Sequence, residues 1–232
     1  MIFKNEGVQK FISESAKMAI TNQNEYSLNE NIQIYIKDKI TSDIDFMDIM
    51  KRVDSVVPMH LMSEVDSIFV GIFEEFEDRD INAMFKDGAI YVSNEQDDVE
   101  DMVDDIVHEI AHSLETPYGG LIYGDKKIEK EYSQKRIKLY EILESEGLSP
   151  DKKIFQDLEF SQEMDDYLYH VVGYDRLNFI SISYGLFVSA YAATSLPEYF
   201  ANGFEHFFLD DRKNLQNCCP QLYQKIEELY EI

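Results

Sequence analysis

The sequence predicts an α+β fold in which a small mixed sheet precedes a mostly helical C-terminal part. Short segments of the first half alternate apolar and polar residues, an Asp-Gly pair marks a tight hairpin, and helical spacing dominates from residue 97 onward. We therefore expect one domain over residues 1–232, with an α/β lobe at 1–96 and a helical lobe at 97–232.

The first half alternates helix and strand patterns. It opens with an amphipathic segment whose apolar residues are Val8, Phe11, Ile12, Ala16 and Ala19. Residues 31–40 then read as a half-buried strand, because three isoleucines fall on one face at period two: Ile32, Ile34 and Ile36. Residues 42–53 return to helical spacing, with Ser42 or Asp43 as the expected cap.

The sheet is expected to continue with an apolar run at 67–73 and a pair of short strands, 81–85 and 89–93. Asp87-Gly88 lies between the two short strands and is a strong hairpin signal. We expect the strand at 89–93 to be an edge strand to which an extended peptide can add. The second half predicts helices at 98–115, 125–146, 151–170, 176–190, 196–209 and from about 220.

The composition excludes some partners. A formal charge of −25 disfavours nucleic acid and anionic lipid, since both bind through Lys and Arg. The acidity fits either a solvated surface or a field that gathers cations and basic peptides. The start lacks a secretory signal and no apolar run approaches the ~20 residues that span a bilayer, so we expect a cytoplasmic protein. Cys218 and Cys219 are adjacent and are expected to be reduced thiols.

The helix at 98–115 carries an unusual polar face. Its apolar residues form one broad stripe: Val103, Ile106, Val107, Ile110, Ala111 and Leu114. His108 and His112 lie on the opposite side, one helical turn apart, so both imidazoles can reach a single ion, with Glu109 beside them. This is the H-E-x-x-H arrangement of zinc metallopeptidases. The alternative is a polar helix face that happens to hold two histidines.

Catalytic zinc needs a third protein ligand and an open position for water. The extended motif H-E-x-x-H-x-x-G-x-x-H is excluded, because Glu115 and Tyr118 stand where its glycine and third histidine belong. A glutamate from a separate helix is the other common solution, and Glu198 is the candidate, with Ala201 and Gly203 small enough to allow a close approach to the histidine helix. Ser195 to Glu198 is also a capping box, which leaves a purely structural role open.

The pairing of "HEIAH" with the later segment "YAATSLPEYFANGF" resembles the gluzincin zinc metallopeptidases. The resemblance is greatest to the anthrax lethal factor catalytic domain and its bacterial and phage-encoded relatives. It implies a zincin-like fold, with the small mixed sheet placing an edge strand over the H-E-x-x-H helix. It also implies zinc as cofactor and a peptide or protein as substrate. By motif position it implies His108, His112 and Glu198 as ligands, Glu109 as general base and Tyr191 as the oxyanion donor. If the chain is virus-encoded, it would act in a host-cell cytoplasm.

The chain departs from that family in two ways. The connection between its two motifs is longer, and Asn202 stands one turn after Glu198, where the relative has an acidic residue. Asp104 and Glu115 lie one turn from a histidine and could orient it. Tyr174 and Tyr184 are competing phenols. We expect His170 and His206 to pack among their aromatic neighbours and not to be ligands, and nothing in the sequence distinguishes His60.

Two other functional classes remain open. The chain could be a catalytically silent zincin that serves as a binding or structural protein, for example in a virion. It could also be an interaction domain without metal, in which Glu198 only caps a helix.

Overall fold

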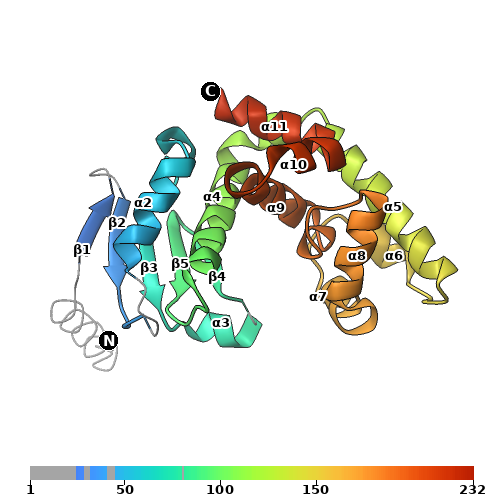
Figure 1. Cartoon of the computed structure of the whole chain (residues 1–232), viewed down its shortest axis with the longest axis horizontal. Coiled ribbons are helices and arrows are strands. Elements are labelled where there is room, and N and C mark those ends of the chain that lie inside the picture. Colours follow the sequence, from blue (N-terminus) through green and yellow to red (C-terminus); the bar gives the residue numbers. More distant parts are fainter. Residues whose placement is uncertain (1–24, 29–31, 41–44, 80) are drawn as a thin grey trace, which may run out of the picture. The chain divides into compact units, whose positions relative to one another are not determined.

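The computed structural model describes residues 25–28, 32–40, 45–79 and 81–232 (Figure 1). They form two compact units. The first contains the described parts of Met1–Lys51 together with Val65–Ile106, and the second contains Arg52–Glu64 and Val107–Ile232. The division after Ile106 therefore falls ten residues later than the predicted lobe boundary at 96. The predicted amphipathic opening and the predicted caps Ser42 and Asp43 lie outside the described residues.

The first unit contains a five-stranded mixed sheet, which confirms the α+β prediction. Its strands are β1 (Glu25–Leu28), β2 (Ile32–Ile36), β3 (Ser67–Gly71), β4 (Ala83–Lys86) and β5 (Ala89–Ser93). The order across the sheet is β1-β2-β3-β5-β4. The three central strands are parallel, and β1 and β4 pair with them antiparallel at the two edges.

The central strands separate apolar and aromatic residues onto opposite faces, as period-two alternation requires. Ile34, Ile68 and Ile90 are paired in register and are fully or almost fully buried. Their neighbours Tyr35, Phe69 and Tyr91 stack in a row on the other face, with ring centroids 4.9 and 5.2 Å apart.

The predicted hairpin is confirmed at Asp87-Gly88. Both residues have positive φ, 52° and 80°, which is the backbone of a two-residue hairpin turn matched to strand twist. However, the prediction that residues 89–93 form an edge strand is wrong. Strand β5 pairs with β3 on one side and β4 on the other, so β4 occupies the edge.

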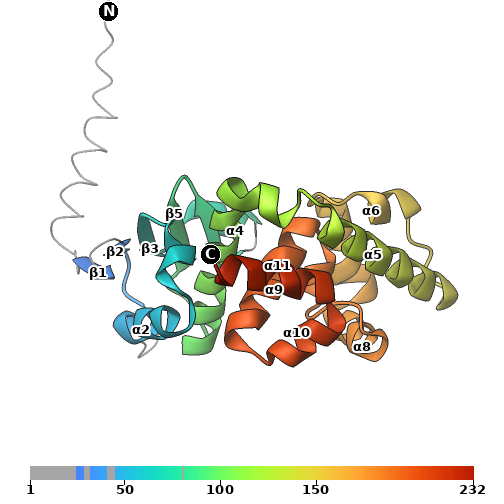
Figure 2. The same cartoon turned by 90° about the horizontal axis from the view of Figure 1, so that it is seen from above.

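The helices before residue 123 are α2 (Phe46–Val56), α3 (Glu74–Arg79) and α4 (Val99–Ile122). The second unit is helical, with α5 (Lys127–Ser145), α6 (Lys152–Gln156), α7 (Gln162–Asp166), α8 (Tyr174–Tyr184), α9 (Leu196–Leu209), α10 (Arg212–Cys218) and α11 (Pro220–Tyr230). Shorter turns are η1 (Met59–Met62), the π-helical η2 (Tyr167–Val172) and η3 (Tyr191–Ala193). Helices α9, α10 and α11 lie side by side in Figure 1 and Figure 2. No described helix combines the length and apolar character needed to cross a bilayer.

Helix α4 is longer than predicted. The sequence predicts an end at residue 115, before Pro117, but the helix continues through the proline to Ile122. A proline inside a helix costs about 3 kcal/mol, because it removes a backbone donor and crowds the preceding turn. Tertiary contacts made by the residues beyond the proline must offset this cost.

The predicted helix at 151–170 is wrong as a single element. The chain leaves helical geometry at Asp157, which is extended at φ −75° and ψ 129°, and resumes a helix only at Gln162. The cause is the buried Arg136 of α5. Its guanidinium donates to the carbonyls of Ile154 and Asp157 at 2.6 and 3.2 Å, and so satisfies acceptors that a continuous helix would have used.

Two further predictions near the C-terminal half need correction. The helix predicted at 176–190 ends at Tyr184, because Gly185 adopts the left-handed conformation that terminates helices. The interpretation of Gly203 is also wrong. An added Cβ there would lie 2.3 Å from Leu222, so this glycine admits α11, and not the histidine helix.

Candidate metal centre

Helix α4 presents two histidines on one face. Asp98 caps its start by accepting from the N–H groups of Glu100 and Asp101. The predicted apolar stripe is buried along the helix, from Val103 to Leu114. The opposite face therefore carries His108 and His112, whose side chains keep only 15% and 20% of their exposure.

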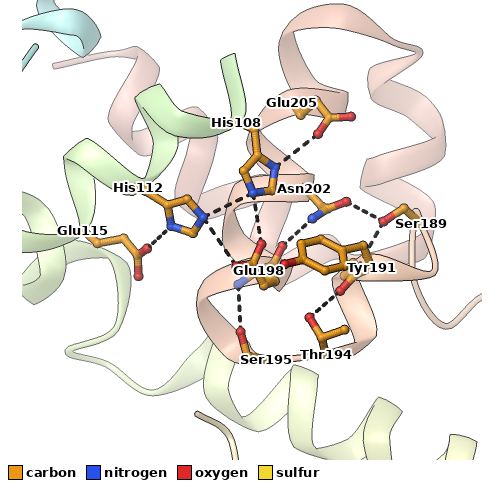
Figure 3. A network of polar contacts seen from close by, with 11 residues as sticks. His108, His112, Glu115, Ser189, Tyr191, Thr194, Ser195, Glu198, Asn202 and Glu205 are labelled. Carbon is orange, nitrogen blue, oxygen red and sulfur yellow. Dashed lines mark hydrogen bonds and ion pairs between the residues drawn. The ribbon is translucent and has the colours of Figure 1, made fainter. Parts of the chain in front are cut away.

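Glu198 comes from the first turn of α9. Ser195 caps this helix, and its hydroxyl accepts from the Glu198 N–H at 3.2 Å. The Glu198 carboxylate points to the two histidines, as Figure 3 shows. The serine half of the predicted capping box is thus present, while the glutamate side chain is used elsewhere.

The three candidate ligands converge on one point (Figure 3). The Nε2 atoms of His108 and His112 are 3.2 Å apart, and the Glu198 carboxylate oxygens lie 3.0 Å from the first and 3.7 Å from the second. Zinc bound tetrahedrally at 2.0–2.1 Å would separate neighbouring ligand atoms by about 3.3 Å. Two imidazole nitrogens and one carboxylate at these separations fit a zinc ion. Among the described residues they are the one such cluster of potential ligands.

In the absence of metal, the surrounding groups favour the protonated form of both histidines and the ionised form of Glu198. Burial lowers the pKa of His108, but hydrogen bonds to Glu198 and Glu205 outweigh it and raise the pKa to about 9. Burial likewise opposes protonation of His112, but Glu115, Glu198 and Glu109 raise its pKa to about 10. Burial would raise the pKa of Glu198, yet the two histidines lower it to about 2. The carboxylates around the two imidazoles therefore attract a cation strongly.

A carboxylate lies near the Nδ1 atom of each histidine. Glu115 Oε1 lies 2.7 Å from Nδ1 of His112, as expected for a residue that orients this ring. Glu205 Oε2 lies 3.4 Å from Nδ1 of His108. Glu115 is held in turn, because the Tyr123 hydroxyl donates to its second oxygen at 2.6 Å.

Asn202 supports the site through backbone contacts. Its side-chain amide donates to the carbonyl oxygen of Glu198 at 2.9 Å, and its Oδ1 accepts from the Ser189 hydroxyl at 2.5 Å. Ser189 also accepts from the Ala192 N–H at 3.1 Å. Asn202 therefore ties the turn that contains Tyr191 to the helix that contains Glu198.

Arg136 holds the other side of the same turn. It is fully buried, and one Nη atom donates to the carbonyls of Ala193 and Thr194, both at 3.0 Å. The neighbouring Tyr132 hydroxyl also donates to Ala193 O at 3.0 Å. These bonds fix the backbone between the tyrosine and the cap of α9.

The two candidate catalytic residues lie beside the cluster. Glu109 follows His108 in α4 and is 7% exposed. The ring centroid of Tyr191 lies 6.4 Å from that of His108, and Figure 3 shows the tyrosine on the Glu198 side. Of the competing phenols, Tyr174 donates to Asp165 at 2.8 Å and Tyr184 is exposed.

The remaining histidines and the cysteines lie outside the cluster. His60 Nε2 lies 3.2 Å from Leu229 O, and His206 pairs with Asp210 at 2.7 Å. His170 is exposed and contacts Tyr169 edge-on. Cys218 and Cys219 are free thiols.

Sequence reasoning missed Glu205 and Tyr123. Glu205 has a recognisable signal, because it lies seven residues after Glu198 and seven residues return to the same helix face. Tyr123 has none, since its place depends on a helix that continues through Pro117.

In comparisons with known proteins, no protein-family model, no curated protein and no solved structure matches the chain.

Proposed function

We propose that this protein is a zinc-dependent metallopeptidase of the gluzincin type with a zincin-like fold. The observation that supports this most is the meeting of His108, His112 and Glu198 at separations of 3.0–3.7 Å, although Glu198 is 90 positions from His108 in the chain. Two neutral imidazoles and one carboxylate are a ligand set of catalytic zinc, and they leave a coordination position for water.

The chemistry of peptide hydrolysis requires an activated water and a stabilised oxyanion. When bound, zinc supplies Lewis acidity, which lowers the pKa of water from about 15.7 to near 7 and polarises a peptide carbonyl. The Glu109 carboxylate accepts the proton from the water and passes it to the leaving amine. The Tyr191 hydroxyl donates a hydrogen bond to the oxyanion.

Metal content tests the ligand set. Protein purified without a histidine tag should carry about one zinc per chain, and His108→Ala and His112→Ala should lose it. Inductively coupled plasma mass spectrometry of the dialysed variants measures this directly. Wild-type protein that takes up no zinc would overturn the proposed site.

A peptide library separates an enzyme from a silent zincin. Glu109→Gln should retain zinc and lose about 10²–10⁴-fold in the rate of peptide cleavage, because it cannot accept the proton. Glu100→Gln makes the same change at an exposed position of α4 and should cleave at the wild-type rate. Equal turnover by Glu109→Gln would remove this residue from the mechanism.

A further inference from the structure

At its Nδ1 atom, His112 contacts a carboxylate, that of Glu115, which is itself held by the hydroxyl of Tyr123. We propose that Tyr123, acting through Glu115, is a positioning residue that fixes the His112 ring for metal binding. This inference rests on the proposed zinc site, and it gives a role to a tyrosine that no motif predicts.

The first step is the bond at Nδ1 of His112. Glu115 Oε1 lies 2.7 Å from this nitrogen, so the carboxylate accepts its proton. A neutral imidazole with the proton on Nδ1 has its lone pair on Nε2. That lone pair then faces the point shared with His108 and Glu198.

The second step is the restraint on Glu115 itself. A glutamate side chain has three rotatable bonds and swings readily when it is 20% exposed and held at one oxygen only. The Tyr123 hydroxyl donates to the other oxygen, Oε2, at 2.6 Å. The carboxylate is thereby held at both ends and presents one fixed oxygen to the histidine. Burial, and then the charge of Glu115, raise the pKa of Tyr123, so its hydroxyl remains a donor.

The third step is the placement of Tyr123. Its backbone N–H donates to Gly119 O at 2.8 Å, which continues the helical bonding just past the end of α4. Its ring contacts Phe200 edge-on, with centroids 6.2 Å apart. Phe200 lies two residues after Glu198, so one tyrosine contacts both ligand-bearing helices. This contact also explains what the turns of α4 beyond Pro117 provide.

The zinc affinity of the full chain tests the two consecutive hydrogen bonds, from Tyr123 to Glu115 and from His112 to Glu115. Competition with a chromophoric chelator should show a loss of about 10–100-fold in Glu115→Gln and of about 10-fold in Tyr123→Phe, as for other residues that orient metal ligands. Tyr118→Phe removes the same atom five residues earlier, within α4, and should bind zinc as the wild type does. Because Tyr123 acts through the carboxylate, Tyr123→Phe should add little to Glu115→Gln in the double variant.

A spectroscopic measurement separates positioning from general loss of stability. With Co²⁺ in place of zinc, Tyr123→Phe should change the visible absorption bands, which report ligand geometry, and Tyr118→Phe should not. Tyr123→Phe with wild-type affinity and spectrum would overturn the inference, as would fully additive losses in the double variant. Wild-type protein that binds neither zinc nor cobalt would overturn the proposed metal site, and this inference with it.

Discussion

Glu198 uses different atoms for two tasks at the start of α9. Its N–H donates to the cap Ser195, and its carboxylate lies between the two histidines. The serine cap and a ligand role therefore do not compete, because this cap needs only the backbone N–H of Glu198, whereas a complete capping box would also need its carboxylate. The fixed backbone at Glu198 also limits where its side chain can reach, which favours a preformed site.

Asn202 offers a test at the residue scale. Asn202→Asp would introduce an acidic residue one turn after Glu198, and it should destabilise the fold. The new carboxylate would replace an amide that donates to Glu198 O, and the side chain is 4% exposed. We expect a loss of about 3 kcal/mol in urea unfolding. Asn214→Asp, at an exposed position, should cost little, and equal losses would contradict this account.

The histidines predict the pH dependence of zinc binding. Their pKa values of about 9 and 10 mean that protons must leave before metal can bind at neutral pH. Zinc affinity should therefore rise by about tenfold or more per pH unit from pH 6 to 8. Titration calorimetry at several pH values measures this. His206→Gln should keep the same slope, and a flat profile would contradict the raised pKa values.

The same pKa shifts predict how the stability of the metal-free protein changes with pH. Protonated histidines in the folded, metal-free protein contribute stability that is fully present below their unfolded pKa of about 6.5. This contribution is lost as pH rises through their folded values of about 9 and 10. Zinc replaces the protons, so the zinc-bound protein should not lose that stability over the same range.

At the scale of elements, the site depends on a turn held from two sides. Asn202 binds the turn around Tyr191 through Ser189, and Arg136 binds the carbonyls of Ala193 and Thr194. The guanidinium is fully buried, and its hydrogen-bond partners within the described part of the chain are all neutral oxygens. Backbone acceptors from two segments, 154–157 and 193–194, therefore share one cation.

Replacing Arg136 should unfold this region first. Arg136→Met leaves buried carbonyls without donors, which we expect to cost about 3 kcal/mol or more. In a chain of this size the melting temperature should fall by about 6–12 °C, measured by circular dichroism. Arg212→Met removes an exposed guanidinium that packs on Phe207 and should cost far less. Comparable losses would show that the buried position of Arg136 is unimportant.

The elements also show what the sequence can predict. The hairpin at Asp87-Gly88 and helix α9 follow from local signals, and the structure confirms both. The break at Asp157 does not, because its cause is an arginine twenty-one positions earlier in the chain. Spacing alone identified His108 and His112, and the need for a third ligand made Glu198 a candidate beside its possible capping role, whereas Glu205 was missed.

At the scale of the whole molecule, the dominant property is a net charge of −25. Carboxylates crowd together even within the first unit, where one cavity is lined by Asn82, Glu95, Gln96, Asp97, Asp101, Asp104 and Asp105. Burial, and then the charges of Asp98 and Asp97, raise the pKa of Asp101. Such self-repulsion destabilises a compact state.

Salt should therefore stabilise the protein. Raising NaCl from about 0.05 M to about 0.5 M shortens the screening length from roughly 14 Å to roughly 4 Å. We expect the melting temperature to increase by several degrees, and KCl at equal ionic strength should act identically because the effect is screening. A melting temperature that stays constant or falls would show that this repulsion is already balanced in the fold.

The contact between Gly203 and Leu222 has a consequence for where this protein tolerates change. Gly203 of α9 has only a hydrogen atom where other residues carry a Cβ, and a methyl group of Leu222 in α11 occupies that space. A methyl group at position 203 would push the two helices apart. Glu198 lies five residues earlier on α9, so a displacement there would tilt the carboxylate. The packing of Leu222 in α11 against α9 therefore helps to set the position of the Glu198 carboxylate.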